Sequence, residues 1–335
     1  MFNLQDTSFH GHAAGYFLLR PVASADTFKN KLAVVEKTNK QFVIPRLEID
    51  NFIQAYSPDP TDHSTMTVDA VTIQLATWNI YTQFNPLDFK EHWFAGEMQE
   101  ELVNAPLPQT AQTFLIQHML DRHNLFVDQL FWRGDTRFNI NNPNYRTATS
   151  VGLSSVDGRT NQQDLNQFDG VIKQLLSASD TIQVSGAVPL TATNSVAALQ
   201  SVYNSIPTAL IQQYGDEGLK FVFSRNTLRL IEQNYNITTT FKNYNYDSPI
   251  NNLFLQYEMV PVSGCPDNTI VAMYMSDNPQ RSNLFFAVNS EKDMANLVMD
   301  KVSPKSDEWF IKGIIKANVG VGWTDQAVIY TTLTY

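Results

Sequence analysis

Residues 109–135 read QTAQTFLIQHMLDRHNLFVDQLFWRGD, and this stretch decides the fold that the chain predicts. The run contains neither proline nor glycine before Gly134. Its apolar residues recur every three or four positions, at Ala111, Phe114, Leu115, Met119, Leu125, Phe126 and Leu130. This spacing is typical of a helix with one buried face. About 24 residues at 1.5 Å each predict a rod of about 36 Å, and Gly134 is a suitable residue to end it.

The region before this helix predicts a long β-hairpin. Residues 32–53 resemble strands, and Pro45 within them indicates an edge or bent strand. A turn-rich tract at 57–62 follows, and 71–75 alternates strictly between apolar and polar residues. A lone hairpin is marginal in water, so we expect this one to lean on another surface.

The first 30 residues show no lasting period of 2 or 3.6. We therefore expect an extended arm that becomes ordered only on another surface. Further helical patterns occupy 87–101, 169–178 and the stretch from 196 onward, where Asn194 or Ser195 is the expected cap. The rest of the chain predicts mainly strands, at 219–224, 248–250, 269–275, 283–288, 311–319 and 326–332. The fold class is α+β, with hairpin, helices and sheets segregated along the chain.

Composition narrows the possible functions. The formal net charge is −10, and the basic residues are scattered instead of forming a stripe, which argues against direct nucleic-acid binding. No apolar run reaches the roughly 18–20 residues that a membrane-spanning helix needs, and the N-terminus does not resemble a secretory signal. The single cysteine, Cys265, cannot form an intrachain disulfide. These features predict a cytoplasmically made protein that does not enter a membrane.

The sequence predicts no catalytic, cofactor-binding or metal-binding residue, and therefore no enzyme and no cofactor. Phosphate-binding glycine loops and a nucleophile elbow are absent from the chain. His10 and His12 could point the same way from a strand, but no further ligand accompanies them. His118 and His123 are five residues apart on the helix and do not converge. Glutamates that could suggest acid–base chemistry are expected to form a solvated helix face, at Glu97, Glu100 and Glu101.

Three short motifs have structural explanations. Arg133-Gly134-Asp135 spells an integrin-binding tripeptide, but a helix-ending glycine accounts for it without a receptor. Asn236-Ile237-Thr238 is a glycosylation sequon that has no use without secretion. Cys265 has no basic sequence neighbour that would lower the pKa of its thiol.

In chain order, the segments resemble the major capsid proteins of tailed bacteriophages, which have the Hong Kong 97-like fold. The family's Trp-x-Gly-Asp step after a long helix is similar to Phe131-Trp132-Arg133-Gly134-Asp135, and its Phe-Asp-Gly step to Phe168-Asp169-Gly170. Further similar segments lie at 193–210, 219–224, 248–250, 266–270, 282–286 and 309–330. The chain departs from the family pattern at Asp247-Ser248, where tyrosine-glycine is common, and at Ala287, where glycine is usual.

The resemblance implies five regions: an N-terminal arm (1–30), an extended hairpin loop (31–85), a spine helix with the first part of a peripheral domain (86–180), an axial domain (181–300) and closing peripheral strands (301–335). It implies a non-enzymatic subunit that assembles as hexamers and pentamers into an icosahedral head shell. That shell would enclose double-stranded DNA without reading its sequence. Scaffolding, portal and decoration proteins are the expected partners, and the virion is the expected location. Lys37 and Lys40 lie in the hairpin, but the covalent cross-link of one branch of the family cannot be matched onto this chain.

Three other functions remain open at this point. An encapsulin-like nanocompartment shell shares the fold but encloses enzymes. A secreted carbohydrate-binding or adhesion protein would suit the aromatic and amide content. A hydrolase with an unrecognised site is the third.

Overall fold

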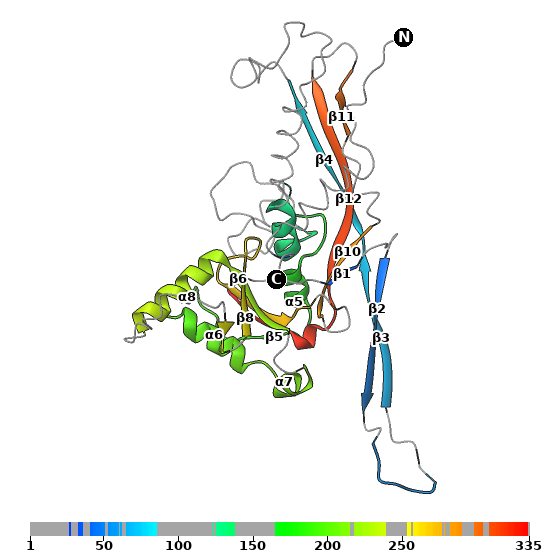
Figure 1. Cartoon of the computed structure of the whole chain (residues 1–335), viewed down its shortest axis with the longest axis vertical. Helices are drawn as coiled ribbons and strands as arrows, with labels where there is room; N and C mark the ends of the chain where they lie inside the picture. The colour runs from blue at the N-terminus through cyan, green and yellow to red at the C-terminus, as the bar shows by residue number, and fades with distance from the viewer. Residues whose placement is uncertain are drawn as a thin grey trace.

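The computed structural model describes residues 27, 33–35, 41–50, 53–59, 61, 65–85, 123, 125–137, 165–214, 218–238, 253–255, 257–276, 278, 282–289, 298–303 and 308–333. Within these ranges the chain forms two mixed sheets, a separate two-stranded hairpin and a group of helices (Figure 1).

A five-stranded sheet is built around one long strand, β12 (Trp309–Val321). Its antiparallel neighbours are β4 (Ala76–Phe84), β10 (Leu284–Val288) and β11 (Val298–Lys301), and β1 (Ala33–Val35) pairs in parallel with β10. Side chains along β4 and most of β12 alternate between buried and more exposed positions. This alternation is the pattern expected for strands that cover a core with one face.

A six-stranded sheet follows the order β5-β13-β9-β6-β8-β7. The strands are β5 (Ile182–Gln183), β6 (Leu219–Ser224), β7 (Leu253–Phe254), β8 (Tyr257–Val262), β9 (Thr269–Tyr274) and β13 (Val328–Thr331). Every residue of β6 and β9 is buried. Both faces of this sheet are therefore covered, which explains why these two strands are almost continuously apolar in sequence.

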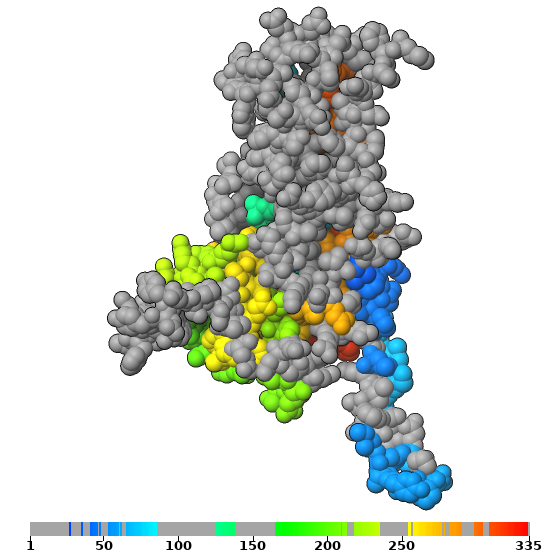
Figure 2. Space-filling model, in the orientation of Figure 1, coloured from blue at the N-terminus to red at the C-terminus, as the bar shows by residue number. Residues whose placement is uncertain are grey.

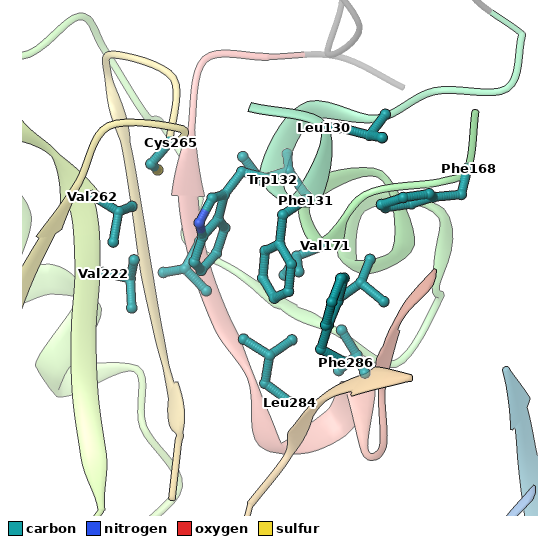
Figure 3. Packing of buried hydrophobic residues seen from close by; sticks show 14 of the residues in the cluster. Leu130, Phe131, Trp132, Phe168, Val171, Val222, Val262, Cys265, Leu284 and Phe286 are labelled. Carbon is teal, nitrogen blue, oxygen red and sulfur yellow. The ribbon is translucent and has the colours of Figure 1, made fainter. Parts of the chain in front are cut away.

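One face of the six-stranded sheet packs against the inner face of the five-stranded sheet, with the helix at 125–133 and α5 (Val171–Ser177) between them. Figure 3 shows Trp132 between the strand residues Val222 and Val262 on one side and Phe131 on the other. Phe131 in turn contacts Phe286 of β10, with ring centroids 5.8 Å apart. A single apolar core thus joins both sheets.

The opposite face of the six-stranded sheet is covered by helices. They are α6 (Ser195–Asn204), α7 (Thr208–Tyr214) and α8 (Arg225–Thr238), which lie together at the side of the molecule away from β12 (Figure 1). Ser224 is the N-cap of α8, because its Oγ accepts a hydrogen bond from the Thr227 N–H at 3.1 Å. Asn194 precedes α6, but its side chain bonds the backbone at Thr191 and Pro189 instead of capping the helix.

The hairpin consists of β2 (Gln41–Asp50) and β3 (Thr65–Gln74), paired antiparallel from Gln41 opposite Gln74 to Asp50 opposite Thr65. It projects away from the rest of the described chain (Figures 1 and 2). Among the described residues, its base is the part that packs against the rest of the chain, where Ile73 contacts Phe285 and Ala287 of β10. The expected hairpin is therefore present, and Pro45 lies in an edge strand as predicted.

The α+β class and several elements are confirmed: α5, α6, β6, β9, β10, β12 and β13 all fall where the sequence predicted them. The helix is observed at 123 and 125–133, while 109–122 lies outside the described residues, as do the predicted elements at 87–101 and 248–250.

Other expectations were wrong. Residues 33–35 were assigned to the hairpin, but they form β1 and pair with β10. After the helical stretch that begins at 196, the chain was expected to be mainly strands, yet it contains the helix α8. The strands β4 and β8 were not predicted.

Strands from the expected axial and closing peripheral regions mix between the two sheets. β10 comes from 181–300 and pairs with β12, whereas β13 comes from 301–335 and pairs with β9. Sheet membership therefore does not change at the expected boundary near residue 300, and the domain division stays a prediction. In the described part of the chain, no helix is long and apolar enough to span a membrane.

Candidate functional site

The hairpin exposes apolar side chains on one face. Leu47 and Val68 are cross-strand partners, and 53% and 68% of their surface is exposed. Val43 and Met66 on the same face are also exposed, at 43% and 61%. Together with Pro45 and Ala70 these residues form what we call the apolar hairpin face. Several large exposed side chains gathered on one face mark an interaction surface more often than scattered ones do.

The opposite face of the hairpin differs along its length. Near the base it turns Phe42, Ile44 and Ile73 toward β10. Nearer the tip it carries the exposed residues Thr65, Thr67 and Asp69. The tip itself is also open to solvent, with Tyr56 at 96% exposure. The apolar hairpin face is therefore directed away from the described core of the chain.

In the core, two sequence motifs meet at the end of the helix, although their glycines, Gly134 and Gly170, are 36 residues apart in the chain. The Gly134 N–H donates to the Leu130 carbonyl at 2.9 Å, and the Gly170 N–H donates to the Gly134 carbonyl at 2.8 Å. A Cβ atom on Gly134 would overlap with the Phe168 carbonyl oxygen, and one on Gly170 would lie 2.6 Å from the Gly134 nitrogen. Only glycine allows the two backbones to approach this closely.

A buried lysine joins the same two motifs. Lys173 Nζ lies 2.7 Å from Asp135 Oδ1 and 2.6 Å from Asp169 Oδ1, and Arg137 also contacts Asp135, at 3.1 Å. Burial alone would raise the pKa of Asp135, but hydrogen bonds from Arg137 and Lys173 outweigh it and lower this pKa. For Asp169, hydrogen bonds from Lys173 and Thr136 likewise outweigh burial and lower the pKa. These carboxylates therefore contribute stability that is lost only as the pH falls below their ordinary range near 3.8.

Arg133 connects the helix to the loop between β8 and β9. Its Nε donates to the Gly264 carbonyl at 2.9 Å and a terminal nitrogen donates to the Cys265 carbonyl at 3.2 Å. Because Arg133, Gly134 and Asp135 are all buried, the tripeptide has a structural role and is not displayed to a receptor. Burial also raises the pKa of the Cys265 thiol well above its usual range, which disfavours a reactive thiolate.

Comparison with known proteins identifies the fold. No known family profile and no curated protein sequence matches the chain. Solved structures do. A chain of the satellite phage P4 procapsid that includes the size determination protein matches with a TM-score of 0.53 and 10% identity, over 96% of this chain and 99% of that one. The capsid of an empty GTA particle matches with a TM-score of 0.57 and 11% identity, over 93% of this chain and 90% of that one.

The capsid of Myoviridae phage XM1 gives a TM-score of 0.51 at 10% identity, over 93% of this chain and 92% of that one. The chain has a bacteriophage capsid fold. Nearly the whole length takes part in each match, so the two sheets, the helices and the hairpin all belong to one capsid fold.

Within this capsid fold, Thr27 of the expected N-terminal arm is attached to the helix. It is completely buried, its hydroxyl contacts Asp128 Oδ1, and the Trp132 indole N–H donates to it at 2.8 Å. The expectation that residues 1–30 depend on another surface was therefore wrong for Thr27, and the other residues of this region lie outside the described ranges. Thr27 was missed because an isolated threonine carries no periodic signal.

Thr27→Val is expected to lower the free energy of unfolding of the protein by about 1–3 kcal/mol. The variant keeps the shape of the side chain but leaves two buried polar partners, Asp128 and Trp132, without the hydroxyl. Urea unfolding followed by circular dichroism measures this loss. Thr27→Ser keeps the hydroxyl and is expected to remain within about 1 kcal/mol of the wild type. Equal losses in both variants would show that the hydroxyl is unimportant.

His123 of the capsid fold is buried between the helix and the five-stranded sheet. The Trp78 indole N–H donates to its Nε2 at 3.4 Å, and its ring lies 6.3 Å from that of Phe126. Among the described residues, no hydrogen-bond partner reaches its Nδ1. Burial lowers the pKa of His123 from 6.5 to about 4. It is a core histidine, so of the surface and packing roles that the sequence left open, the packing role is the one observed.

The stability of the folded protein is expected to fall as the pH drops from 6.5 to 4. In this window the unfolded chain binds a proton at His123 and the folded chain does not, so acid favours unfolding. At 1.4 kcal/mol per pH unit the total effect is about 3 kcal/mol. Urea titrations at pH 7, 6, 5 and 4 should show a smaller loss in His123→Gln than in the wild type. Parallel curves for the two proteins would contradict the assignment.

The remaining sequence candidates do not form a chemical site in the described part of this capsid fold. His10, His12, His118, the three glutamates at 97–101 and both hairpin lysines lie outside the described residues, as does Asp247-Ser248. Where the structure is described, no group of three His, Cys, Asp or Glu side chains could hold a metal ion. The sequon at 236–238 lies at the end of α8.

Asn283 lies in the segment 282–286 that is similar to the family pattern, but the sequence did not predict what its side chain does. The Asn283 side chain donates to the Trp323 carbonyl at 2.6 Å and accepts from the Trp323 N–H at 2.5 Å. It thereby copies a strand pairing and ties β10 to the turn after β12. A buried asparagine just before an apolar strand is the signal that could have predicted this contact.

Proposed function

We propose that the chain is the major capsid protein of a tailed bacteriophage, with the Hong Kong 97-like fold. Copies of it would assemble as hexamers and pentamers into an icosahedral head shell that encloses double-stranded DNA. The observation that carries this proposal is the capsid fold over 96% of this chain and 99% of the compared P4 procapsid chain. The charge of −10 fits a shell that encloses DNA without sequence-specific contacts.

In this proposal the β2–β3 hairpin is the extended loop of the family, and the helix that ends at 133 is its spine. The six-stranded sheet with α6, α7 and α8 corresponds to the axial domain, and the five-stranded sheet to the peripheral domain. Scaffolding, portal and decoration proteins are the further partners, and the subunit is made in the host cytoplasm before it joins the virion. The subunit performs no catalysis.

The apolar hairpin face supplies the contact between subunits. A second copy of the chain is the partner, because in a closed shell the same surfaces must meet repeatedly around symmetry axes. Complete burial of a large apolar side chain contributes about 1.5–3 kcal/mol, so covering the exposed part of Val43, Leu47, Met66 and Val68 favours the contact. Phage capsid structures with TM-scores above 0.5 support a phage shell over the nanocompartment alternative, and the capsid fold gives no support to an adhesion protein or a hydrolase.

Leu47→Asp combined with Val68→Asp is expected to abolish particle formation while leaving the subunit folded. The two residues face each other on the apolar hairpin face, and they are exposed in the subunit, so their loss costs the isolated fold little. Sedimentation velocity measures assembly, and circular dichroism measures folding.

The matched control is Thr65→Asp combined with Thr67→Asp, which adds the same charge to exposed positions on the other face of β3. This control should assemble like the wild type. If the Leu47/Val68 variant forms normal particles, the apolar hairpin face is not an assembly surface. If both variants fail, the hairpin tolerates no added charge and the choice of face is wrong.

A further inference from the structure

The direction of the hairpin is decided at a single residue. β3 ends at Gln74 and β4 begins at Ala76, so only Leu75 separates them. Before this point the strand pairs with β2, and after it the strand pairs with β12. The hairpin can therefore swing as a unit about Leu75 unless side chains hold its base.

Ile73 is fixed against a notch in the five-stranded sheet. Only 3% of its surface is exposed, and it packs with Phe285 and Ala287 of β10. A methyl group at Gly320 of β12 would overlap with Cγ1 and Cδ1 of Ile73. The absence of a side chain at Gly320 thus creates the space that Ile73 fills.

Asn318 holds the next residue of the hairpin. The backbone ladder between β4 and β12 ends where Ala76 faces Ala317. One residue further along β12, the Asn318 side chain donates from Nδ2 to the Gln74 carbonyl at 2.6 Å. Its Oδ1 accepts from the Val319 N–H at 2.7 Å, which fixes the orientation of the amide. The side chain therefore continues the ladder across the point where the backbone strands separate.

We propose that Ile73, Gly320 and Asn318 act as a clamp that sets the direction of the hairpin, and that this direction determines the size of the assembled particle. The second part rests on the proposed function. A small change at the clamp moves the tip of the hairpin a long way. Ten residues at about 3.3 Å each make a strand of about 33 Å, so a tilt of about 10° at the base moves its far end by about 6 Å. A shift of this size changes the angle at which neighbouring subunits meet.

The clamp can be tested on the unassembled full-length subunit. Nitroxide labels at Ser57→Cys in the tip and Gln200→Cys on α6 report the position of the hairpin by pulsed electron paramagnetic resonance. Both positions are exposed, whereas the native Cys265 is buried and does not compete for the label. We expect one narrow distance distribution in the wild type. Gly320→Ala should shift its maximum by several ångströms, and Asn318→Ala should broaden it.

A second substitution distinguishes a specific effect on the clamp from a general loss of stability. Ile73→Ala in the Gly320→Ala background removes the overlapping atoms, and the new methyl fills part of the space. The double variant should return the distance maximum toward the wild-type value, so the two effects should be strongly non-additive. Gly186→Ala is the control, because a Cβ there meets nothing within 4 Å. An unshifted distribution in Gly320→Ala, or no rescue in the double variant, would overturn the clamp.

Particle diameters from electron microscopy test the second part. Gly320→Ala should change the diameter distribution, and the double variant should restore it. Shifted label distances with unchanged diameters would overturn the link to particle size. If no protein, the wild type included, forms particles, the proposed function fails, while the label distances still decide whether the clamp exists.

Discussion

Gly134→Ala is expected to prevent the subunit from folding. The added Cβ would overlap with the Phe168 carbonyl oxygen and lie 2.7 Å from the Leu130 carbonyl oxygen. Both are backbone atoms at the centre of the core, so neither can move aside as a flexible side chain would. We expect a loss of at least about 4 kcal/mol, a large share of the 5–15 kcal/mol that stabilises a typical domain. Soluble yield and thermal unfolding followed by circular dichroism measure the effect.

Gly186→Ala provides the comparison. Gly186 has a φ of +73°, but a Cβ there has open space. Gly186→Ala should therefore lower the free energy of unfolding by only about 1–2 kcal/mol, which is the cost of placing a side chain in the left-handed region. A Gly134→Ala subunit as stable as the Gly186→Ala subunit would show that the backbones at 134 and 170 can separate easily.

Lys173→Met is expected to destabilise the subunit by about 3–5 kcal/mol. Lys173 and Asp135 are both almost completely buried, so the variant leaves the Asp135 charge without its closest partner. Urea unfolding at pH 7 measures the change. Asp135 retains Arg137, but that side chain is 38% exposed and is screened by solvent.

Two further variants make the Lys173 experiment specific. Lys173→Met combined with Asp135→Asn should be more stable than Lys173→Met alone, because the second change removes the uncompensated charge. Arg137→Met should cost no more than about 1 kcal/mol, as is usual for a partly exposed ion pair. A loss for Lys173→Met no larger than that for Arg137→Met would contradict a tight buried pair.

Much of the sheet framework could be predicted from the sequence because burial and periodicity agree there. β6 and β9 are buried on both faces, so they appear as mainly apolar runs, with Lys220 as the exception inside β6. The hairpin was recognisable from its alternation and its turn-rich tip. β1 was assigned to the hairpin because its sequence neighbours are hairpin residues, while the parallel pairing with β10 joins segments about 250 residues apart.

The missed elements have weaker local signals. α8 is largely polar, and its buried side chains, among them Thr227, Ile231 and Asn234, include few apolar residues to mark a stripe. Its cap at Ser224 was the signal available, but this residue was counted only as the end of a strand. β4 follows β3 almost directly, so a change of pairing partner at Leu75 could not be seen in the sequence.

The junction at Gly134 shows what sequence patterns cannot supply. Gly134 was expected to end the helix, and the helix does end at 133. Among the glycines of the described residues, positive φ angles are found at Gly186 and Gly218, so Gly134 does not end the helix through a left-handed turn. Its actual role is to permit contact with Gly170, a residue of another motif. Both motifs were recognised, but their meeting in space depends on the path of the intervening chain.

Cryo-electron microscopy of the purified full-length chain, alone and with a scaffolding partner, tests the central claim most directly. The proposal predicts closed shells with icosahedral symmetry, in which the apolar hairpin face of each subunit is covered by a neighbouring copy. Monomers alone under every assembly condition, or particles in which Leu47 and Val68 remain open to solvent, would contradict it.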